Sequence, residues 1–168
     1  MIRLELLDRS HLDGLAAVAA DPDVRRFTRI PDPVPPGFPE TWLGRFEEGR
    51  REGAREGFAI VGGGSEFLGV AVVPKLDRDA RTAELGYVVV REARGRGVAT
   101  EALRLLTEWA FAEAGMLRLE LLISVDNAAS KRVAERCGYV REGVLRSLYV
   151  KQDVREDTEI WSRLVDDP

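Results

Sequence analysis

Residues 94–100 combine two arginines with two glycines, a set of residue types suited to binding phosphate groups. Gly95 and Gly97 let the backbone turn sharply and approach a ligand without a Cβ in the way. Arg94 and Arg96 supply positive charge that can pair with phosphate oxygens. The stretch matches neither the GxxxxGKS/T loop nor the GxGxxG loop of nucleotide-binding proteins. Taken alone, it is equally consistent with a tight turn whose arginines are solvated.

An apolar segment precedes this turn and a helical pattern follows it. Residues 83–90 are almost wholly apolar, which is typical of a strand buried on both faces. Between Val98 and Ala110, apolar residues recur at the spacing of one helical face, and Gly115 is placed to end that helix. A strand, a glycine turn and a helix start bring free backbone N–H groups and the positive end of a helix dipole together. This combination favours an anion at the turn, and phosphate above others.

A second strand and a short second helix follow in the chain. Residues 118–124 have the pattern of a strand, so with the preceding strand and helix they predict a βαβ unit with two parallel strands. Asn127 is a suitable N-cap for the next helix, and Gly138 is a suitable terminator. Ser130 falls in the first turn of that helix, close to Arg132.

These motifs resemble the GNAT superfamily of N-acetyltransferases, and within it the RimJ/RimL-like acetyltransferases of ribosomal-protein N-termini. The family pattern Q/R-x-x-G-x-G/A, which binds a pyrophosphate, is matched by Arg94, Gly97 and Ala99. The subgroup pattern N-x-x-S-x-R/K, followed by glycine and an aromatic residue, is matched by Asn127, Ser130, Arg132, Gly138 and Tyr139. The resemblance covers nearly the whole chain. It implies one domain over residues 1–168 with the α/β GNAT fold: a twisted, mixed, mostly antiparallel sheet, a central βαβ unit and about four helices.

The resemblance also implies that acetyl-CoA is the co-substrate, and we expect no metal. The pantetheine arm would lie along the end of the strand before the turn, where a backbone N–H could polarise the thioester carbonyl. That arrangement requires the two parallel strands to diverge, as they do in the family. The predicted coenzyme-binding residues are Val88, Val89, Val90, Arg94, Gly95, Arg96, Gly97, Val98, Ala99, Thr100, Asn127, Ser130 and Arg132.

Ser130 and Glu84 are the predicted catalytic residues. Many superfamily members protonate the leaving thiolate with a tyrosine seven residues after the asparagine, but that position is Ala134 here. The RimL-like subgroup offers a serine at the position of Ser130, which would act through a hydrogen bond in a dry, oriented site. The alternative is that this serine satisfies backbone groups of its own helix.

Glu84 is the one carboxylate inside the apolar segment 83–90. Burial there would raise its pKa and suit the group to act as a base. A structural carboxylate paired with an arginine is nearly as well supported by the sequence.

The rest of the chain predicts an edge strand at 2–7, helices at 11–20 and 41–55, a hairpin within 58–73 and two strands within 140–164. Residues 27–40 hold five of the eight prolines, which predicts neither helix nor central strand there. Loops of this length in a compact domain are often binding loops. The resemblance places the acceptor-binding wall near the first two helices, so we expect this segment to contribute to the site.

Composition excludes several other classes. With 45% hydrophobic and 32% charged residues, the chain has the balance of an ordinary globular protein. A net charge of −4 disfavours an RNA-binding module, and no apolar run approaches the ~20 residues that span a bilayer. The single cysteine rules out an internal disulfide, so we expect a cytoplasmic protein. No histidine, cysteine and carboxylate cluster has metal-ligand spacing.

We therefore expect an N-acetyltransferase that moves an acetyl group directly from acetyl-CoA to a primary amine. The resemblance favours the α-amino group of a protein or peptide as the acceptor, and relatives often form homodimers. A small-molecule amine, such as an amino acid, polyamine or aminoglycoside, is the main enzymatic alternative. A sensor that binds acetyl-CoA without turnover is the alternative from another class. Neither a nucleic acid nor a membrane is an expected partner.

Overall fold

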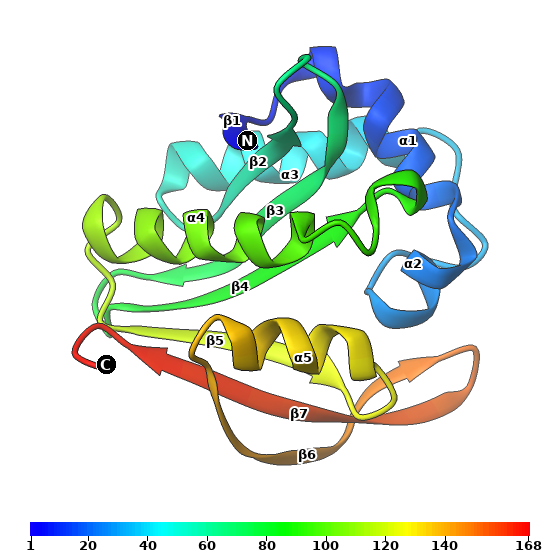
Figure 1. Cartoon of the computed structure of the whole chain (residues 1–168). Coiled ribbons are helices and arrows are strands. Elements are labelled where there is room, and N and C mark those ends of the chain that lie inside the picture. The colour runs from blue at the N-terminus through cyan, green and yellow to red at the C-terminus, as the bar shows by residue number, and fades with distance from the viewer.

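The strand predicted before residues 94–100 is the central strand of a seven-stranded sheet in the computed structural model, which describes residues 1–168, and the predicted turn and helix follow it. The strands are β1 Arg3–Leu6, β2 Glu56–Val61, β3 Phe67–Asp77, β4 Thr82–Val89, β5 Arg118–Ser124, β6 Val140–Lys151 and β7 Val154–Leu164. Their spatial order is β1-β2-β3-β4-β5-β7-β6 (Figure 1). Every neighbouring pair is antiparallel except β4 and β5, which are parallel. The predicted α/β fold with its βαβ unit is therefore confirmed.

Helices cover both faces of this sheet. They are α1 Leu12–Ala20, α2 Pro22–Phe27, α3 Phe38–Glu52, α4 Val98–Ala112 and α5 Ala128–Arg136, with short 3-10 turns at Arg9–His11 and Arg91–Ala93. Helices α4 and α5 bury side chains on one face, whereas α1, α2 and α3 bury theirs on the other. None of the helices combines the length and the apolar character needed to cross a membrane.

Two helix starts differ from the sequence prediction. The prolines of residues 27–40 predict no helix, yet α3 begins at Phe38 with Pro39 in its first turn. Proline is tolerated there because the first N–H groups of a helix have no helical partner. The short helix α2 was also not predicted, although Asp21 caps its first turn and Pro22 begins it. Both signals are typical of a helix start, so the local sequence does contain this element.

Strands β4 and β5 separate after a short paired segment. Residues 82–84 pair with residues 118–120, and no pairing between the two strands follows. Beyond that point β5 stays paired with β7, along residues 118–124. The last residues of β4, 85–89, therefore have β3 on one edge and no strand on the other. This is the divergence that the resemblance required.

The two faces of β4 are buried to different degrees. Ala83, Leu85 and Val89 are buried on the face covered by α4, whereas Glu84 and Val88 on the other face are only partly buried. The prediction of a strand buried on both faces is therefore wrong for the second face. The reason is that a cavity, described below, lies over part of it.

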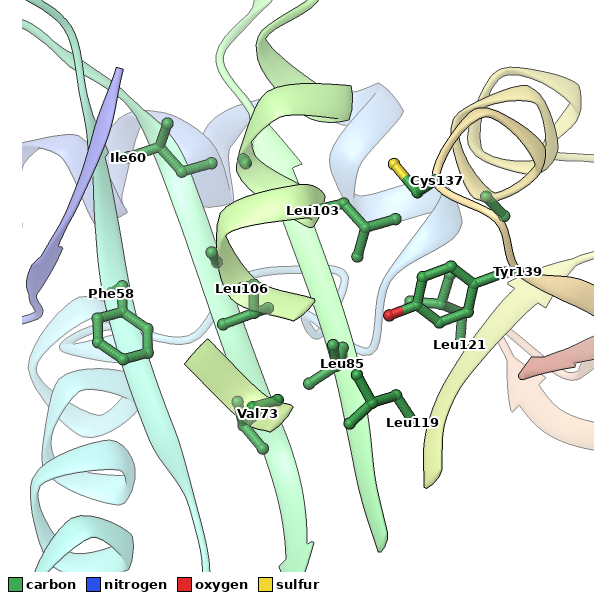
Figure 2. Packing of buried hydrophobic residues seen from close by; sticks show 14 of the residues in the cluster. Phe58, Ile60, Val73, Leu85, Leu103, Leu106, Leu119, Leu121, Cys137 and Tyr139 are labelled. Atoms are coloured by element: carbon green, nitrogen blue, oxygen red, sulfur yellow. The ribbon is translucent and has the colours of Figure 1, made fainter. Parts of the chain in front are cut away.

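The buried face of β4 packs under α4 in the largest hydrophobic cluster (Figure 2). Leu103 and Leu106 of α4 are completely buried there, and each such side chain contributes roughly 1.5–3 kcal/mol to folding. Tyr139 lies in the same cluster and its hydroxyl is 2.7 Å from the Thr107 hydroxyl, so its polar end is satisfied. This packing fixes where α4 begins relative to the end of β4.

Gly69 of β3 permits the close approach of β3 and β4, and replacing it is expected to destabilise the protein. Its φ is 151°, and an added Cβ would overlap the carbonyl oxygen of Val88 and lie 3.0 Å from Val89 Cα. Because these obstacles are backbone atoms, we expect Gly69→Ala to lower the free energy of unfolding by about 3 kcal/mol. Urea denaturation measures the loss. Gly44→Ala is the matched control, since a Cβ at Gly44 in α3 meets no atom within 4 Å. Equal stability of the two variants would contradict the prediction.

Candidate active site

The turn between β4 and α4 presents unused backbone N–H groups at the start of a 15-residue helix. Gly95 and Gly97 have φ values of 73° and 80°, a region that favours glycine. No atom lies within 4 Å of the place that a Cβ would take at either residue. The N–H groups of residues 95–100 donate no hydrogen bond within the chain. Because such N–H groups and the helix dipole attract anions, the open turn fits a phosphate group.

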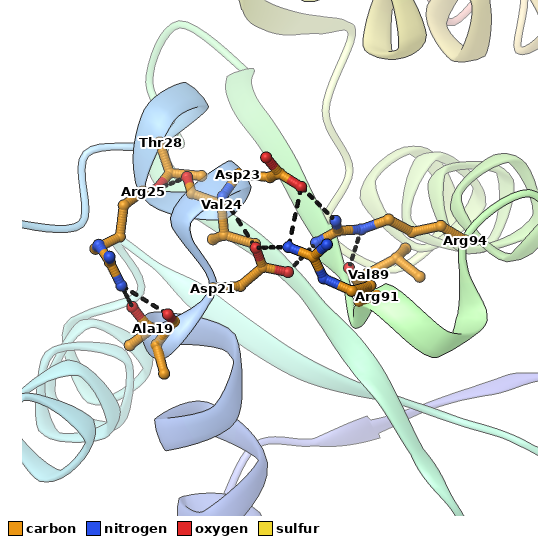
Figure 3. Close-up of polar contacts among 10 residues, drawn as sticks. Ala19, Asp21, Asp23, Val24, Arg25, Thr28, Val89, Arg91 and Arg94 are labelled. Carbon is orange, nitrogen blue, oxygen red and sulfur yellow. Dashed lines mark hydrogen bonds and ion pairs between the residues drawn. The ribbon is translucent and has the colours of Figure 1, made fainter.

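Arg94, predicted to pair with phosphate, has other partners in the structure (Figure 3). Its Nη2 lies 2.6 Å from Asp21 Oδ2, and its Nη1 lies 3.3 Å from Asp23 Oδ2. Its Nε donates to the carbonyl oxygen of Val89 at 3.1 Å. Arg91 adds contacts of 3.2 Å to both aspartates. The side chain of Arg94 thus ties the turn to the start of α2 and to the end of β4.

Three other arginines surround a cavity of about 400 Å³ beside the same turn. Arg96, Arg104 and Arg136 line it together with Gly97 and Thr100. Unlike Arg91, Arg94 and Arg118, none of these three side chains is held in an ion pair. Their guanidinium groups are therefore free to bind phosphate oxygens.

Arg104 and Arg136 were not predicted from the sequence, although helical spacing contains the signal. Arg104 lies four residues after Thr100 on α4, and Arg136 lies four residues after Arg132 on α5. Residues four apart share one face of a helix, so each arginine extends a predicted binding residue by one turn. Arg132 itself is exposed on α5.

The free edge of β4 offers backbone groups to an extended ligand. The Val90 N–H donates to the Leu68 carbonyl oxygen at 2.9 Å, so β3 already uses this donor. Because bonding alternates along an antiparallel strand, Val88 also faces β3, and the Val89 N–H faces the gap beside β5. Of the three predicted valines, Val89 is therefore the one whose N–H is directed toward the gap.

Ser130 lies at the N-terminus of α5 beside a tyrosine that sequence reasoning missed. The Ser130 N–H donates to Asn127 Oδ1 at 3.1 Å, so Asn127 caps the helix as expected. Ser130 Oγ lies 2.9 Å from the hydroxyl of Tyr87 on β4. Burial raises the pKa of Tyr87 to about 12, so its hydroxyl stays protonated. The sequence did contain a signal for this residue: Tyr87 is a side chain with a polar tip inside the otherwise apolar segment 83–90.

Glu84 projects from the opposite face of β4, away from Ser130. Its Oε1 lies 2.9 Å from Arg29 Nη2, and Arg29 also contacts the Tyr149 hydroxyl and stacks over that ring at 4.6 Å. Burial raises the pKa of Glu84 above its ordinary 4.5; Arg29 opposes the rise and Glu120 adds to it. A raised pKa and an arginine partner, both considered from the sequence, thus occur together.

A cavity of about 380 Å³ lies on the Glu84 side of the sheet. Leu122, Leu145, Leu148 and Ile160 form its apolar wall. Glu84 and Glu120 are its two carboxylates, and each is matched by an arginine, because Glu120 lies 2.8 Å from Arg118. Arg29, which belongs to the proline-rich segment 27–40, also lines this cavity.

Comparison with known proteins groups the chain with acetyltransferases. A family model described as an acetyltransferase (GNAT) domain matches residues 2–140. The provisionally named ribosomal N-acetyltransferase YdaF of Bacillus subtilis is 39% identical over 85 residues, 50% of this chain and 46% of that protein. The chain spans about half the length of the curated relatives that it matches.

Two solved structures share the fold over nearly the whole chain. RimL, a ribosomal alpha-N-protein acetyltransferase in complex with coenzyme A, has a TM-score of 0.90 at 19% identity, covering 99% of this chain and 96% of its own. Spermidine N-acetyltransferase from Vibrio cholerae, in complex with CoA and spermine, has a TM-score of 0.88 at 17% identity and covers 99% and 96%. The same fold thus serves proteins named for a protein acceptor and for a polyamine acceptor.

Proposed function

The chain belongs to the GNAT acetyltransferase family, and on that premise we propose that it transfers the acetyl group of acetyl-CoA to the α-amino group of a protein or peptide. The transfer is direct, with both substrates bound at once. The observation that carries the proposal is the divergence of β4 and β5 beside a turn whose N–H groups are free. An extended chain that ends in phosphates fits this combination.

Acetyl-CoA has both features that the coenzyme side of the site would bind. Its pyrophosphate is suited to the N–H groups of residues 95–100, and its pantetheine arm can lie along the free edge of β4 like an added strand. The Val89 N–H is then the donor available to a thioester carbonyl, and such a donor stabilises negative charge developing on that oxygen. Ser130 would donate to the departing sulfur.

The cavity beside Glu84 supports a single amine as the acceptor. Its two carboxylates, Glu84 and Glu120, are balanced in number by the two cations that also line it, Arg29 and Lys75, so it has little surplus negative charge. A polycation would therefore gain little there. Its apolar wall suits the side chain next to an α-amino group, and Glu84 could accept the proton of that group directly or through water.

A small diamine or polyamine is the second candidate acceptor, because Glu84 and Glu120 face the same cavity. If an ammonium group displaced the Arg29 guanidinium from Glu84, the two carboxylates could pair with two positive charges.

The test is CoA release from acetyl-CoA with peptides of different N-termini, spermidine, spermine and free amino acids as acceptors. Gly97→Trp is the control, because its indole would fill the open turn. Turnover with a peptide, lost in the control, supports the proposal. Turnover with polyamines alone would show that the acceptor is a polyamine and not a peptide. Acetyl-CoA binding by calorimetry with no turnover would indicate a sensor, and no binding would overturn the proposal.

Arg104→Ala is expected to raise the KM for acetyl-CoA by about tenfold with little change in kcat. The reason is that Arg104 lines the cavity beside the turn without an ion-pair partner, so its charge is available to the 3′-phosphate. The loss should disappear with the 3′-dephospho form of acetyl-CoA, which steady-state kinetics can compare directly. Arg51→Ala, at an exposed position of α3, is the control. An equal rise in KM with both coenzyme forms would show that Arg104 does not act on the 3′-phosphate.

A further inference from the structure

The Tyr87 and Ser130 hydroxyls form a pair that joins β4 to α5. Their oxygens are 2.9 Å apart, and both side chains are partly buried. Tyr87 lies in the segment of β4 that has lost β5 as a neighbour. The pair therefore stands at the gap that the proposed function assigns to the thioester.

We propose that Tyr87 is a positioning residue that orients the Ser130 hydroxyl toward the sulfur of the thioester. This inference rests on the proposed function, because it takes the gap beside β4 as the place of the reacting bond. Tyr87 acts through Ser130 and touches neither substrate in this role.

The direction of the hydrogen bond follows from the chemistry of the two groups. A phenol is more acidic than an aliphatic alcohol, so the Tyr87 O–H is the better donor and Ser130 Oγ the better acceptor. Tyr87 remains protonated because burial raises its pKa to about 12. A serine hydroxyl has one hydrogen and two lone pairs. With one lone pair bound by Tyr87, and no other partner for Oγ in the chain, the serine hydrogen is left for a group in the gap.

The chemical role of this hydrogen is to stabilise the leaving group. As the amine nitrogen bonds to the carbonyl carbon, the carbon–sulfur bond breaks and its electron pair moves to sulfur. The Ser130 O–H donates to that sulfur, and the hydrogen bond from Tyr87 strengthens this donor, because linked hydrogen bonds polarise one another. Overall, the acceptor nitrogen loses the proton that sulfur gains.

A second hydroxyl pair in the same core provides a matched control. Tyr139 lies 2.7 Å from Thr107, is buried, and also has a pKa raised by burial. It packs against α4 inside the hydrophobic cluster (Figure 2). Tyr139→Phe therefore removes a comparable buried hydrogen bond at a place without a role in the proposed reaction.

The experiment is a double-mutant cycle of Tyr87→Phe and Ser130→Ala, with kcat and the KM for acetyl-CoA measured for each. We expect Ser130→Ala to lower kcat about a hundredfold and Tyr87→Phe about tenfold. In the Ser130→Ala background, Tyr87→Phe should have no further effect. In Ser130→Thr, which keeps a hydroxyl, the dependence on Tyr87 should return. Acetyl-CoA affinity should stay unchanged in Tyr87→Phe, and Tyr139→Phe should leave kcat unchanged.

Three results would overturn the inference: a wild-type kcat in Tyr87→Phe, a tenfold loss that persists in the Ser130→Ala background, or a raised KM with unchanged kcat. Thermal unfolding of Tyr87→Phe and Tyr139→Phe separates a folding defect from the proposed role. If the wild-type protein does not bind acetyl-CoA or does not turn it over, the proposed function itself is wrong. Failure of the proposed function is therefore distinguishable from failure of the inference about Tyr87.

Discussion

Glu84→Gln is expected to lower kcat by about two orders of magnitude while leaving the affinity for acetyl-CoA unchanged. Glu84 lines the cavity in which the proposed function places the acceptor, and burial raises its pKa above 4.5. An acceptor amine is bound mostly as its ammonium form near neutral pH, so the reaction needs a group that takes up a proton. Glutamine keeps the size and the hydrogen-bonding oxygen of glutamate but cannot act as a base.

The pH dependence of kcat gives this prediction a distinctive sign. A base must be ionised to act, so activity should rise with pH through the raised pKa of Glu84. This acidic limb should vanish in Glu84→Gln, whereas a limb caused by the acceptor amine should persist and move with the pKa of the amine chosen. Glu120→Gln is the matched control, because Glu120 lines the same cavity from β5 and is likewise paired with an arginine, Arg118. A larger loss in Glu120→Gln would transfer the role of base to that residue.

Local sequence predicts the central part of this fold well, because its signals lie within a few residues of one another. The apolar segment 83–90, the glycines at 95 and 97, and the cap at Asn127 each indicate a local conformation. The βαβ unit then follows, since a helical crossover is the usual connection between parallel strands, and β4 and β5 are parallel. Even α2, which was missed, begins with an ordinary Asp-Pro start.

Contacts between distant residues were not predictable in the same way. Tyr87 and Ser130 are 43 residues apart, and Arg29 and Glu84 are 55 apart, so no local pattern links them. The one-sided burial of β4 depends on where β5 leaves it, which is a property of the register between strands. The sequence indicates Glu84 and Ser130 as candidates for catalysis. Their placement on opposite faces of the sheet depends on how the strands are paired, which the local sequence does not specify.

Asp21→Asn is the second substitution from which we expect a large effect, because Asp21 holds the residue that begins the phosphate-binding pattern. Asp21 Oδ2 binds Arg94 Nη2 at 2.6 Å, and its Oδ1 binds Arg91 at 3.2 Å (Figure 3). Arg94 in turn donates to the Val89 carbonyl oxygen. Asp21 is thereby linked both to the turn and to the peptide at the end of β4.

The charge of Asp21 matters for these contacts. Burial opposes its ionisation, but hydrogen bonds from the Asp23 N–H and from Arg94 outweigh this and lower the pKa of Asp21 below 3.8. A lowered pKa stabilises the fold above the unfolded-state pKa, and this stability is lost as pH falls through the folded-state value. The stability difference between wild type and Asp21→Asn, about 1 kcal/mol near neutral pH, should therefore disappear in strong acid.

The KM for acetyl-CoA distinguishes two roles for Arg94. If Arg94 works by bracing the turn, Asp21→Asn should raise this KM about tenfold, because the amide keeps the helix cap but loses the charge that holds the guanidinium. If Arg94 is instead a phosphate ligand restrained by Asp21, freeing it should lower the KM.

Asp23→Asn is the control, since the Asp23 side chain is 61% exposed and that of Asp21 only 10%. Arg94→Lys should resemble Asp21→Asn, because a lysine cannot bind Asp21, Asp23 and the Val89 carbonyl through one planar group. If Arg94 holds the turn in place, the KM should rise in both Asp21→Asn and Arg94→Lys but not in Asp23→Asn. A fall in KM for Asp21→Asn would contradict this role.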